Sequence, residues 1–306
     1  MSDTAFDIAI IGSGAAGLQA AIHAARRKHS VVVLGRAHRS NAVRGHMENY
    51  FAVENMGGKE MVDVGVAQAR KFGATVREED VTALAPDEEG RFRLTLESRD
   101  AVIATAVVIA TGISLERLGV PGEKELIGRG VSYCVDCDAN FFRQQTVAVV
   151  GNGSAAVEGA LTLLAYATEV QLACATLDVD SSLRSRLESS AVKVHADSTV
   201  KMIRGEGTVQ GLVLEGGQDI TVDGVFVELG SKGVMELTID LGVELDAESF
   251  KYIVTDKQQK TNVPGVFAAG DVCGGRKQIA KAVGEGCVAG LSASAFVREK
   301  TKASAP

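Results

Sequence analysis

The sequence lacks any apolar run long enough to cross a membrane. Its most apolar stretch, AVIATAVVIATGI, has 13 residues, whereas a membrane-spanning helix needs about 20. The N-terminus, MSDTAFDIAIIG, carries acidic residues where a secretory signal peptide would carry positive charge. We therefore expect a soluble, cytoplasmic protein with no membrane as a partner.

Positive charge is also scarce. The chain has 32 Lys and Arg against 39 Asp and Glu, which gives a formal net charge of −7. Proteins that bind nucleic acid or anionic membranes use basic surface to neutralise phosphates, so neither is an expected partner. The length of 306 residues, 46% of them hydrophobic, fits two globular domains.

A disulfide framework is missing too, because the five cysteines are odd in number and unevenly spaced. Cys174, Cys273 and Cys287 are isolated, and isolated cysteines mostly serve packing. Cys134 and Cys137 form a C-x-x-C within VSYCVDCDANFF. A closed zinc site needs four ligands, and no second C-x-x-C or Cys/His cluster supplies them, so no metal site is predicted. The pair is a candidate thiol–disulfide centre.

Glycine, by contrast, is abundant, and two glycine-rich loops repeat along the chain. Both DIAIIGSGAAGLQAA at 7–21 and TVAVVGNGSAAVEGA at 146–160 combine an apolar strand, a G-x-G-x-x-G/A loop and an Ala-rich helix. The first glycine of such a loop permits the tight turn, and the second lets a pyrophosphate approach the backbone. The helix N-terminus adds N–H donors for the phosphates. The repeat predicts two dinucleotide-binding units.

The order of these signals predicts that one unit is inserted into the other. Strand-and-turn signals recur in AVIATAVVIATG and TNVPGVFAAGD, and a helical pattern follows near the end of the chain. We predict an α/β fold with two Rossmann-like dinucleotide-binding domains. Residues 1–115 and 245–306 would form a discontinuous domain, with residues 116–244 inserted and a hinge near Pro121 and Gly122.

Together these motifs resemble the low-molecular-weight thioredoxin reductases, which are FAD flavoproteins of the pyridine nucleotide–disulfide oxidoreductase group. The matching segments span nearly the whole chain: GSGAAG, MENYF, ATG, VPGVFAAGDV, RKQIAKAVGEGC and GRGVSYCVDCDANFFRQQTVAVVG. The resemblance implies FAD in the discontinuous domain, a homodimer, and a thioredoxin-like protein as the disulfide substrate.

The resemblance also implies which residues contact FAD. Asn49, Gln278 and Ile279 would lie near the flavin ring, and Asp271 would lie at the ribityl or phosphate region. The acid expected after the second strand is absent, and Arg36 stands there as a candidate contact of the adenosine part. The full predicted set is Gly12, Ser13, Gly14, Ala15, Ala16, Gly17, Gly35, Arg36, Asn49, Val81, Ala110, Thr111, Gly112, Gly270, Asp271, Lys277, Gln278 and Ile279.

In the thioredoxin reductases the C-x-x-C is the redox-active dithiol. By resemblance, Cys137 would accept electrons from the flavin, Cys134 would attack the substrate disulfide, and Asp138 would transfer the proton. A helix N-terminus would lower a thiol pKa and Asp136 would raise it, and which effect dominates stays open. Because one dithiol must meet both a buried flavin and an external disulfide, the inserted domain is expected to rotate.

The NADPH part of the family pattern is absent. NADPH-using members carry His-Arg-Arg-x-x-x-Arg, whose guanidinium groups hold the 2′-phosphate. Here CATLDVD occupies the aligned positions, and Asp178 and Asp180 would repel a phosphate. The second glycine loop, made of Gly151, Asn152 and Gly153, remains. This site is therefore open to NADH, another nucleotide, a second flavin or no ligand, and NADPH is not the expected donor.

Three functions stay open. The first is an FAD-dependent reductase of thioredoxin-like proteins, fed by ferredoxin or another acidic carrier. The segment RAHRSNAVRGH at 36–46 has three Arg, two His and no acid, so it either docks such a carrier or is a basic loop beside the FAD phosphates. The alternatives are a dithiol oxidase with oxygen as acceptor and a non-enzymatic flavin/thiol redox sensor. GRGVSY and C-V-D-C-D favour the reductase.

Overall fold

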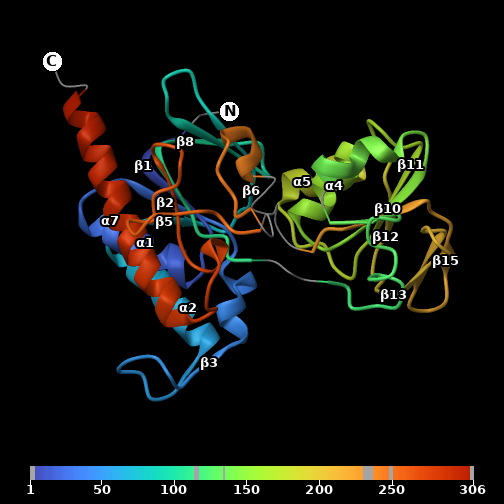
Figure 1. Cartoon of the computed structure of the whole chain (residues 1–306), viewed down its shortest axis with the longest axis horizontal. Helices are drawn as coiled ribbons and strands as arrows, with labels where there is room; N and C mark the ends of the chain where they lie inside the picture. The colour runs from blue at the N-terminus through green and yellow to red at the C-terminus, as the bar shows by residue number, and fades with distance from the viewer. Residues whose placement is uncertain (1–3, 114–116, 134, 230–236, 248–250, 304–306) are drawn as a thin grey trace. The chain divides into compact units, whose positions relative to one another are not determined.

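The structure, a computed structural model, has two compact units (Figure 1). The described residues are 4–113, 117–133, 135–229, 237–247 and 251–303. The first unit comprises residues 1–113 and 233–306, and the inserted unit comprises residues 114–232. The chain returns to the first unit earlier than the predicted residue 245, because Leu237 and Val243 pack into that unit's core. None of the helices in the described ranges is long and apolar enough to cross a membrane.

The first unit is built on a mainly parallel sheet. Its strands are β1 (Thr4–Ile11), β2 (Val31–Leu34), β5 (Thr75–Arg77), β6 (Val81–Pro86), β7 (Phe92–Leu96), β8 (Ala101–Ile109) and β17 (Val266–Ala268). The order is β5-β2-β1-β8-β7-β6, with β17 also paired to β8. β6 and β7 add an antiparallel edge. β8 is almost entirely buried along its length, as expected for a strand that is covered on both faces of its sheet.

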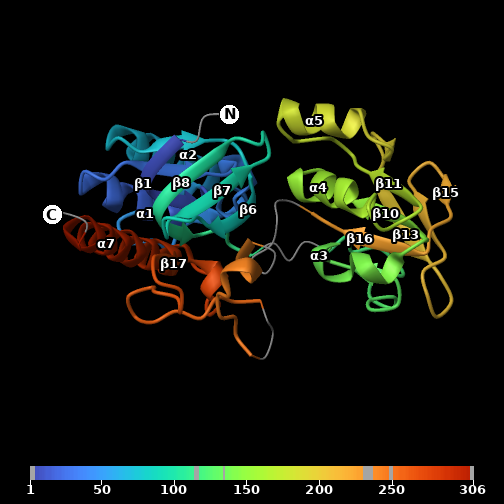
Figure 2. The same ribbon diagram turned by 90° about the horizontal axis from the view of Figure 1, so that it is seen from above.

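The α-helices described in the first unit are α1 (Ala15–Arg26), α2 (Gly58–Lys71) and α7 (Ile279–Ala303). α1 and α7 lie side by side (Figures 1 and 2). A Cβ at Gly286 would lie only 2.2 Å from the carbonyl oxygen of Ala16, so glycine permits the close approach of the two helices. Short elements complete the unit: η1 (Ala37–Arg39), η2 (Asn41–Arg44), β3 (His46–Met47), β4 (Met56–Gly57), η4 (Ile239–Leu241) and η5 (Asp271–Cys273).

The inserted unit repeats this plan on a smaller scale (Figure 2). Its parallel sheet has the order β12-β11-β10-β16-β9, with β9 (Val131–Ser132), β10 (Thr146–Val150), β11 (Glu169–Ala173), β12 (Lys193–His195) and β16 (Gly224–Val227). Its helices are α3 (Val135–Asp138), η3 (Ala139–Phe142), α4 (Ser154–Leu163) and α5 (Ser181–Glu188). An antiparallel sheet is formed by β13 (Val200–Arg204), β14 (Gly211–Leu214) and β15 (Asp219–Ile220). Two Rossmann-like units, the second inserted into the first, confirm the predicted fold class.

Candidate functional site

The first glycine loop joins β1 to α1 by a tight backbone crossing. Gly12 has a φ of +112°, and a Cβ there would lie 2.2 Å from the carbonyl oxygen of Ala110. A Cβ at Gly17 would lie 1.9 Å from the carbonyl oxygen of Gly12. Gly14 is the N-cap of α1, and within the described part of the chain no side chain caps this helix end. The N–H groups of the first turn, which includes Ala15, are therefore donors suited to a phosphate.

Two more predicted turns lie at the same end of the sheet. They follow β8, which pairs with β1 in parallel, and β17, which pairs in parallel with β8. The N–H of Ala110 donates to the carbonyl of Ile11 at 2.7 Å, and the N–H of Ala269 donates to the carbonyl of Ile109 at 3.0 Å. Ligands of open α/β sheets bind at the carboxyl ends of such strands. The turn at Ala110–Gly112, the turn at Gly270 and the first glycine loop thus form one edge that fits a dinucleotide.

The motifs did not single out the two α7 residues that hold the Gly270 turn. Gly270 has a φ of +91°. Its N–H donates to Glu285 Oε2 at 2.9 Å, and its carbonyl accepts a hydrogen bond from Lys281 Nζ at 3.0 Å. Lys281 also pairs with Glu285 at 2.9 Å. Their i, i+4 spacing on a helix is the one signal that sequence offers for this pair, and the pair fixes the backbone just before Asp271.

Two predicted flavin contacts come together from distant parts of the chain. Asn49 Nδ2 donates to Gln278 Oε1 at 3.3 Å, although 229 residues separate them. Both side chains are exposed, as is Lys277, and Ile279 is the first residue of α7. Two of the residues that the resemblance assigns to the flavin ring are therefore hydrogen-bonded to each other.

Gly35 lies beside the first glycine loop. Val81 is the first residue of β6. Ser13 Oγ donates to the carbonyl of Gly35 at 3.0 Å, so the loop is tied to the end of β2. Gly35 has a φ of +132°, a conformation that favours glycine. Ala16 packs against Gly270, where a Cβ would lie 2.9 Å from that of Ala16. These positions join the loop to its neighbouring turns.

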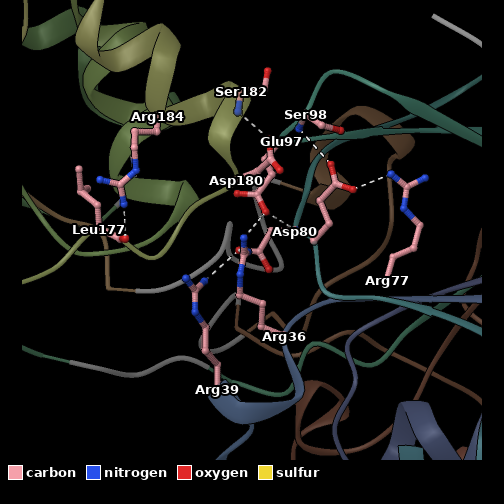
Figure 3. A network of polar contacts seen from close by, with 11 residues as sticks. Arg36, Arg39, Arg77, Asp80, Glu97, Ser98, Leu177, Asp180, Ser182 and Arg184 are labelled. Carbon is pink, nitrogen blue, oxygen red and sulfur yellow. Dashed lines mark hydrogen bonds and ion pairs between the residues drawn. The ribbon is translucent and has the colours of Figure 1, made fainter.

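Arg36, the candidate adenosine contact, belongs to a buried ion-pair cluster (Figure 3). Its side chain is 7% exposed and pairs with Asp80 at 2.9 Å and with Glu97. Arg39 donates to Asp80, also at 2.9 Å. Burial raises the pKa of Glu97, while the neighbouring Arg36 charge opposes the rise. Two cations and two carboxylates thus balance one another beside the start of β6.

This cluster changes the interpretation of segment 36–46. Arg36 and Arg39 face Asp80 and Glu97, which come from positions far along the chain. Two of the three arginines are therefore neutralised within the unit, and the side chain of Arg44 lies outside the described set. The hypothesis that this segment docks an acidic carrier loses most of its electrostatic basis.

The predicted thiol pair falls largely outside the described residues, which omit Cys134 and the side chain of Cys137. Their surroundings are described. Asp138, the last residue of α3, is half-buried, and its Oδ2 accepts a hydrogen bond from Ser132 Oγ at 2.7 Å. A carboxylate that directly follows Cys137 in the sequence and is held in this way is suited to proton transfer.

The second glycine loop keeps its tight turn, but a neighbouring loop binds to it. A Cβ at Gly151 would lie 1.9 Å from a carbonyl oxygen just after β16, and Gly153 is the N-cap of α4. Asn152 Oδ1 accepts the N–H groups of Ala175 and Thr176 at 2.9 and 3.4 Å. These two residues align with the arginines of the NADPH-binding pattern. Here they hold Asn152 through their backbone and offer no cation.

Two arginines downstream of this loop are engaged within the inserted unit. Arg184 Nη2 donates to the carbonyl of Leu177 at 2.7 Å (Figure 3). Arg186 makes two hydrogen bonds to Glu158, at 2.5 and 3.0 Å. Asp180 caps α5 by accepting the N–H of that helix's second residue at 2.7 Å. Both guanidinium groups are thus hydrogen-bonded within the inserted unit.

Two of the three isolated cysteines, Cys174 and Cys273, fit the packing role expected of them. Burial raises the pKa of the Cys174 thiol, with a further rise from Asp197. Burial also raises the pKa of Cys273 to about 12, so neither thiol is poised as a thiolate. Among the residues described, no group of three or more His, Cys, Asp and Glu could hold a metal ion.

Comparison with known proteins decides the family. The family described as "Pyridine nucleotide-disulphide oxidoreductase" matches residues 6–286. The chain belongs to this family. It is 35% identical over 306 residues to the thioredoxin reductase of Listeria monocytogenes, covering 96% of this chain and 94% of the relative. It is 33% identical over 307 residues to that of Treponema pallidum, covering 96% and 98%.

Solved structures of thioredoxin reductases are similar to this chain as well. The atypical thioredoxin reductase TRi from Desulfovibrio vulgaris Hildenborough has a TM-score of 0.78 and 35% identity, with 96% and 98% of the two chains covered. A ferredoxin-flavin thioredoxin reductase from Clostridium acetobutylicum has a TM-score of 0.69 and 29% identity, with 97% and 100% covered. The predicted family and enzyme class are confirmed: the protein is a flavin-dependent disulfide oxidoreductase of the thioredoxin reductase type. Family membership implies FAD.

Proposed function

We propose that this flavoprotein passes electrons from FAD through Cys137 and Cys134 to the disulfide of a thioredoxin-like protein. The observation that carries the proposal is the meeting of three turns, after β1, β8 and β17, at one edge of the first unit's sheet. Relatives named thioredoxin reductases support the substrate class.

The proposed FAD contacts are those predicted from the sequence, and the local geometry supports them. Gly12, Gly14 and the first turn of α1 would hold the pyrophosphate. Asp271 would reach the ribityl region, and Asn49 and Gln278 would border the flavin ring. When bound, FAD supplies two-electron redox chemistry.

The proposed thiol chemistry proceeds by disulfide exchange. The Cys134 thiolate attacks one sulfur of the substrate disulfide, forms a mixed disulfide and expels a thiolate, which takes a proton from Asp138. Cys137 then attacks the Cys134 sulfur, which releases the reduced partner and closes the Cys134–Cys137 disulfide. Two electrons and two protons return this disulfide to the dithiol.

We further propose a donor other than NADPH. The backbone at Ala175 and Thr176 holds Asn152, and Arg184 and Arg186 are engaged elsewhere, so no described cation is placed for a 2′-phosphate. The similarity to a ferredoxin-flavin thioredoxin reductase makes ferredoxin, or another protein carrier, the preferred donor. Three roles stay open for the second glycine loop: it binds NADH, it binds a second flavin, or it binds no ligand.

We also propose two features that the family implies. The protein would form a homodimer, and the inserted unit would rotate to bring the dithiol alternately to the flavin and to the substrate. The linkers at 114–116 and 230–236 lie outside the described residues.

Single-turnover reduction of thioredoxin tests the proposed route. Anaerobically photoreduced enzyme is mixed with oxidised thioredoxin, and thioredoxin thiols are counted against flavin reoxidation. We expect the wild type to release fully reduced thioredoxin as its flavin is reoxidised. Cys137→Ser should stop at a mixed disulfide between Cys134 and thioredoxin, with the flavin still reduced. Release of fully reduced thioredoxin by Cys137→Ser, with flavin reoxidation at the wild-type rate, contradicts the route. Peroxide production from small dithiols without thioredoxin turnover would identify a dithiol oxidase instead.

A further inference from the structure

Two buried glutamates hydrogen-bond to the residues on either side of Cys134. We propose that Glu123 and Glu228 are positioning residues that fix the thiol segment, residues 131–142, within the inserted unit. The inference rests on the proposed dithiol function and deepens it. No motif in the sequence singles out either glutamate.

Glu228 binds the segment on the C-terminal side of Cys134. Glu228 is 6% exposed. Its Oε1 accepts a hydrogen bond from the N–H of Val135, the first residue of α3, at 3.1 Å. Its own N–H donates to the carbonyl of Val150 at 2.9 Å, which extends the pairing of β16 with β10. A Cβ at Gly151 would lie 1.9 Å from the carbonyl oxygen of Glu228. Glu228 therefore connects the sheet edge at the second glycine loop to the dithiol helix.

Glu123 binds the segment on the N-terminal side. It is 1% exposed, and its Oε1 accepts hydrogen bonds from the Tyr133 hydroxyl at 2.8 Å and from the N–H of Leu118 at 2.9 Å. Its Oε2 accepts the N–H of Gly119 at 2.7 Å. Burial and the Glu123 carboxylate raise the pKa of Tyr133 to about 12, so its hydroxyl remains a donor. Glu123 thus ties the thiol segment to the residues that follow the first linker.

Close packing supports the same arrangement. Val135 is buried, and a Cβ at Gly159 of α4 would lie 3.0 Å from Val135 Cγ2. Glycine at this position lets α3 pack directly on α4. A buried carboxylate costs free energy unless its oxygens accept hydrogen bonds. Here both glutamates accept hydrogen bonds from the thiol segment, and Glu123 also accepts them from Leu118 and Gly119.

The consequence concerns how the dithiol is delivered. Both glutamates belong to the inserted unit, so the flanks of Cys134 are fixed to that unit's own sheet and linker. Displacing a reacting atom by 1 Å can cost about 100-fold in rate. We therefore expect Tyr133 and Val135 to keep their positions within the inserted unit while the dithiol reacts.

Two substitutions at Glu228 separate the effect of losing the hydrogen-bond acceptor from the effect of changing the side chain. Glu228→Gln keeps an oxygen that accepts the Val135 N–H, whereas Glu228→Ala removes it. Photoreduced enzyme is mixed with oxidised thioredoxin, and separately with ferricyanide, which reads flavin oxidation without the dithiol. We expect Glu228→Ala to slow thioredoxin reduction by roughly 10- to 100-fold. Ferricyanide reduction should be unchanged, and Glu228→Gln should recover the rate to within about threefold.

Two further variants supply a control and a separate test of Glu123. Glu125→Ala removes an exposed glutamate nearby and should behave as wild type. Tyr133→Phe removes one donor to Glu123 with little change in volume and should slow the same step by roughly threefold or more. Flavin content and thermal unfolding establish that each variant is folded.

The outcomes for the two proposals differ. A folded Glu228→Ala variant with the wild-type thioredoxin rate, or Glu228→Gln as slow as Glu228→Ala, overturns the role of Glu228. Tyr133→Phe at the wild-type rate overturns that of Glu123. Failure of the wild type itself to reduce thioredoxin would instead reject the proposed function.

Discussion

At the scale of single residues, buried and half-buried carboxylates recur around the candidate site. Glu123 and Glu228 bind the neighbours of Cys134, the half-buried Glu285 holds the Gly270 turn, and Glu97 pairs with Arg36. Each accepts hydrogen bonds from backbone N–H groups or from cations, which offsets the cost of removing charge from water. Of these four acids, only Glu285 lies within a segment that matches the family pattern.

The pH dependence of stability should reveal Glu97. Because burial raises its pKa, the native chain retains a proton at pH values where the unfolded chain has released it. Stability from this group is therefore present at low pH and is lost as pH rises through the raised pKa. Glu97→Gln cannot titrate, so the difference in unfolding free energy, wild type minus variant, should grow as pH falls from neutral toward the ordinary carboxyl range.

Urea unfolding at constant ionic strength measures this difference. Glu88→Gln changes an exposed acid and serves as the control, with a difference that stays flat across the same pH range. A flat difference for Glu97→Gln as well would show that burial does not raise this pKa.

At the scale of helices and strands, local patterns predicted the elements but not their long-range partners. The two glycine loops, each between an apolar strand and an Ala-rich helix, were predicted from spacing because each is encoded within about 15 residues. The bond from Val135 to Glu228 joins residues 93 apart. Arg36 and Glu97 are 61 apart. Such pairs depend on strand order, which no local spacing contains.

The same limit explains why the sequence left two interpretations of segment 36–46 open. The segment itself contains no acid, and the acids that neutralise Arg36 and Arg39 come from near β6 and β7. Similarly, the early return of the chain to the first unit depends on Leu237 and Val243 reaching its core. Apolar residues within a loop-rich stretch do not indicate which of two cores they join.

The contact between α1 and α7 should be sensitive to a single methyl group. A Cβ at Gly286 would meet backbone atoms of Ala16 at 2.2 Å, whereas a Cβ at Gly284 has no neighbour within 4 Å among the described atoms. We expect Gly286→Ala to lower the unfolding free energy by roughly 1–3 kcal/mol and to weaken FAD retention. Gly284→Ala should raise it by roughly 0.5–1 kcal/mol.

Denaturant unfolding and flavin release during gel filtration check both variants. Because the two positions lie on one helix two residues apart, helix propensity changes equally, and only the contact with α1 differs. Equal stability of the two variants would contradict close packing of the helices.

At the scale of the whole molecule, one architectural plan occurs twice with different consequences. Both glycine loops leave their helix N-terminus without a side-chain cap at the N-cap residue, but the first loop shares its sheet edge with two other turns. In the inserted unit, Asn152 instead binds the loop at Ala175 and Thr176. The first unit is thus suited to FAD. In the described part of the inserted unit, Arg184 and Arg186 are bonded elsewhere, which is why we propose a donor other than NADPH.

Anaerobic titration of the purified flavoprotein with NADPH, NADH and reduced ferredoxin tests this account most directly. Flavin is counted per chain first, and flavin absorbance is followed during each addition, with oxidised thioredoxin added at the end. Reduced ferredoxin should bleach the flavin, and thioredoxin should restore its absorbance, while NADPH leaves it unchanged. Rapid bleaching by micromolar NADPH would contradict the account.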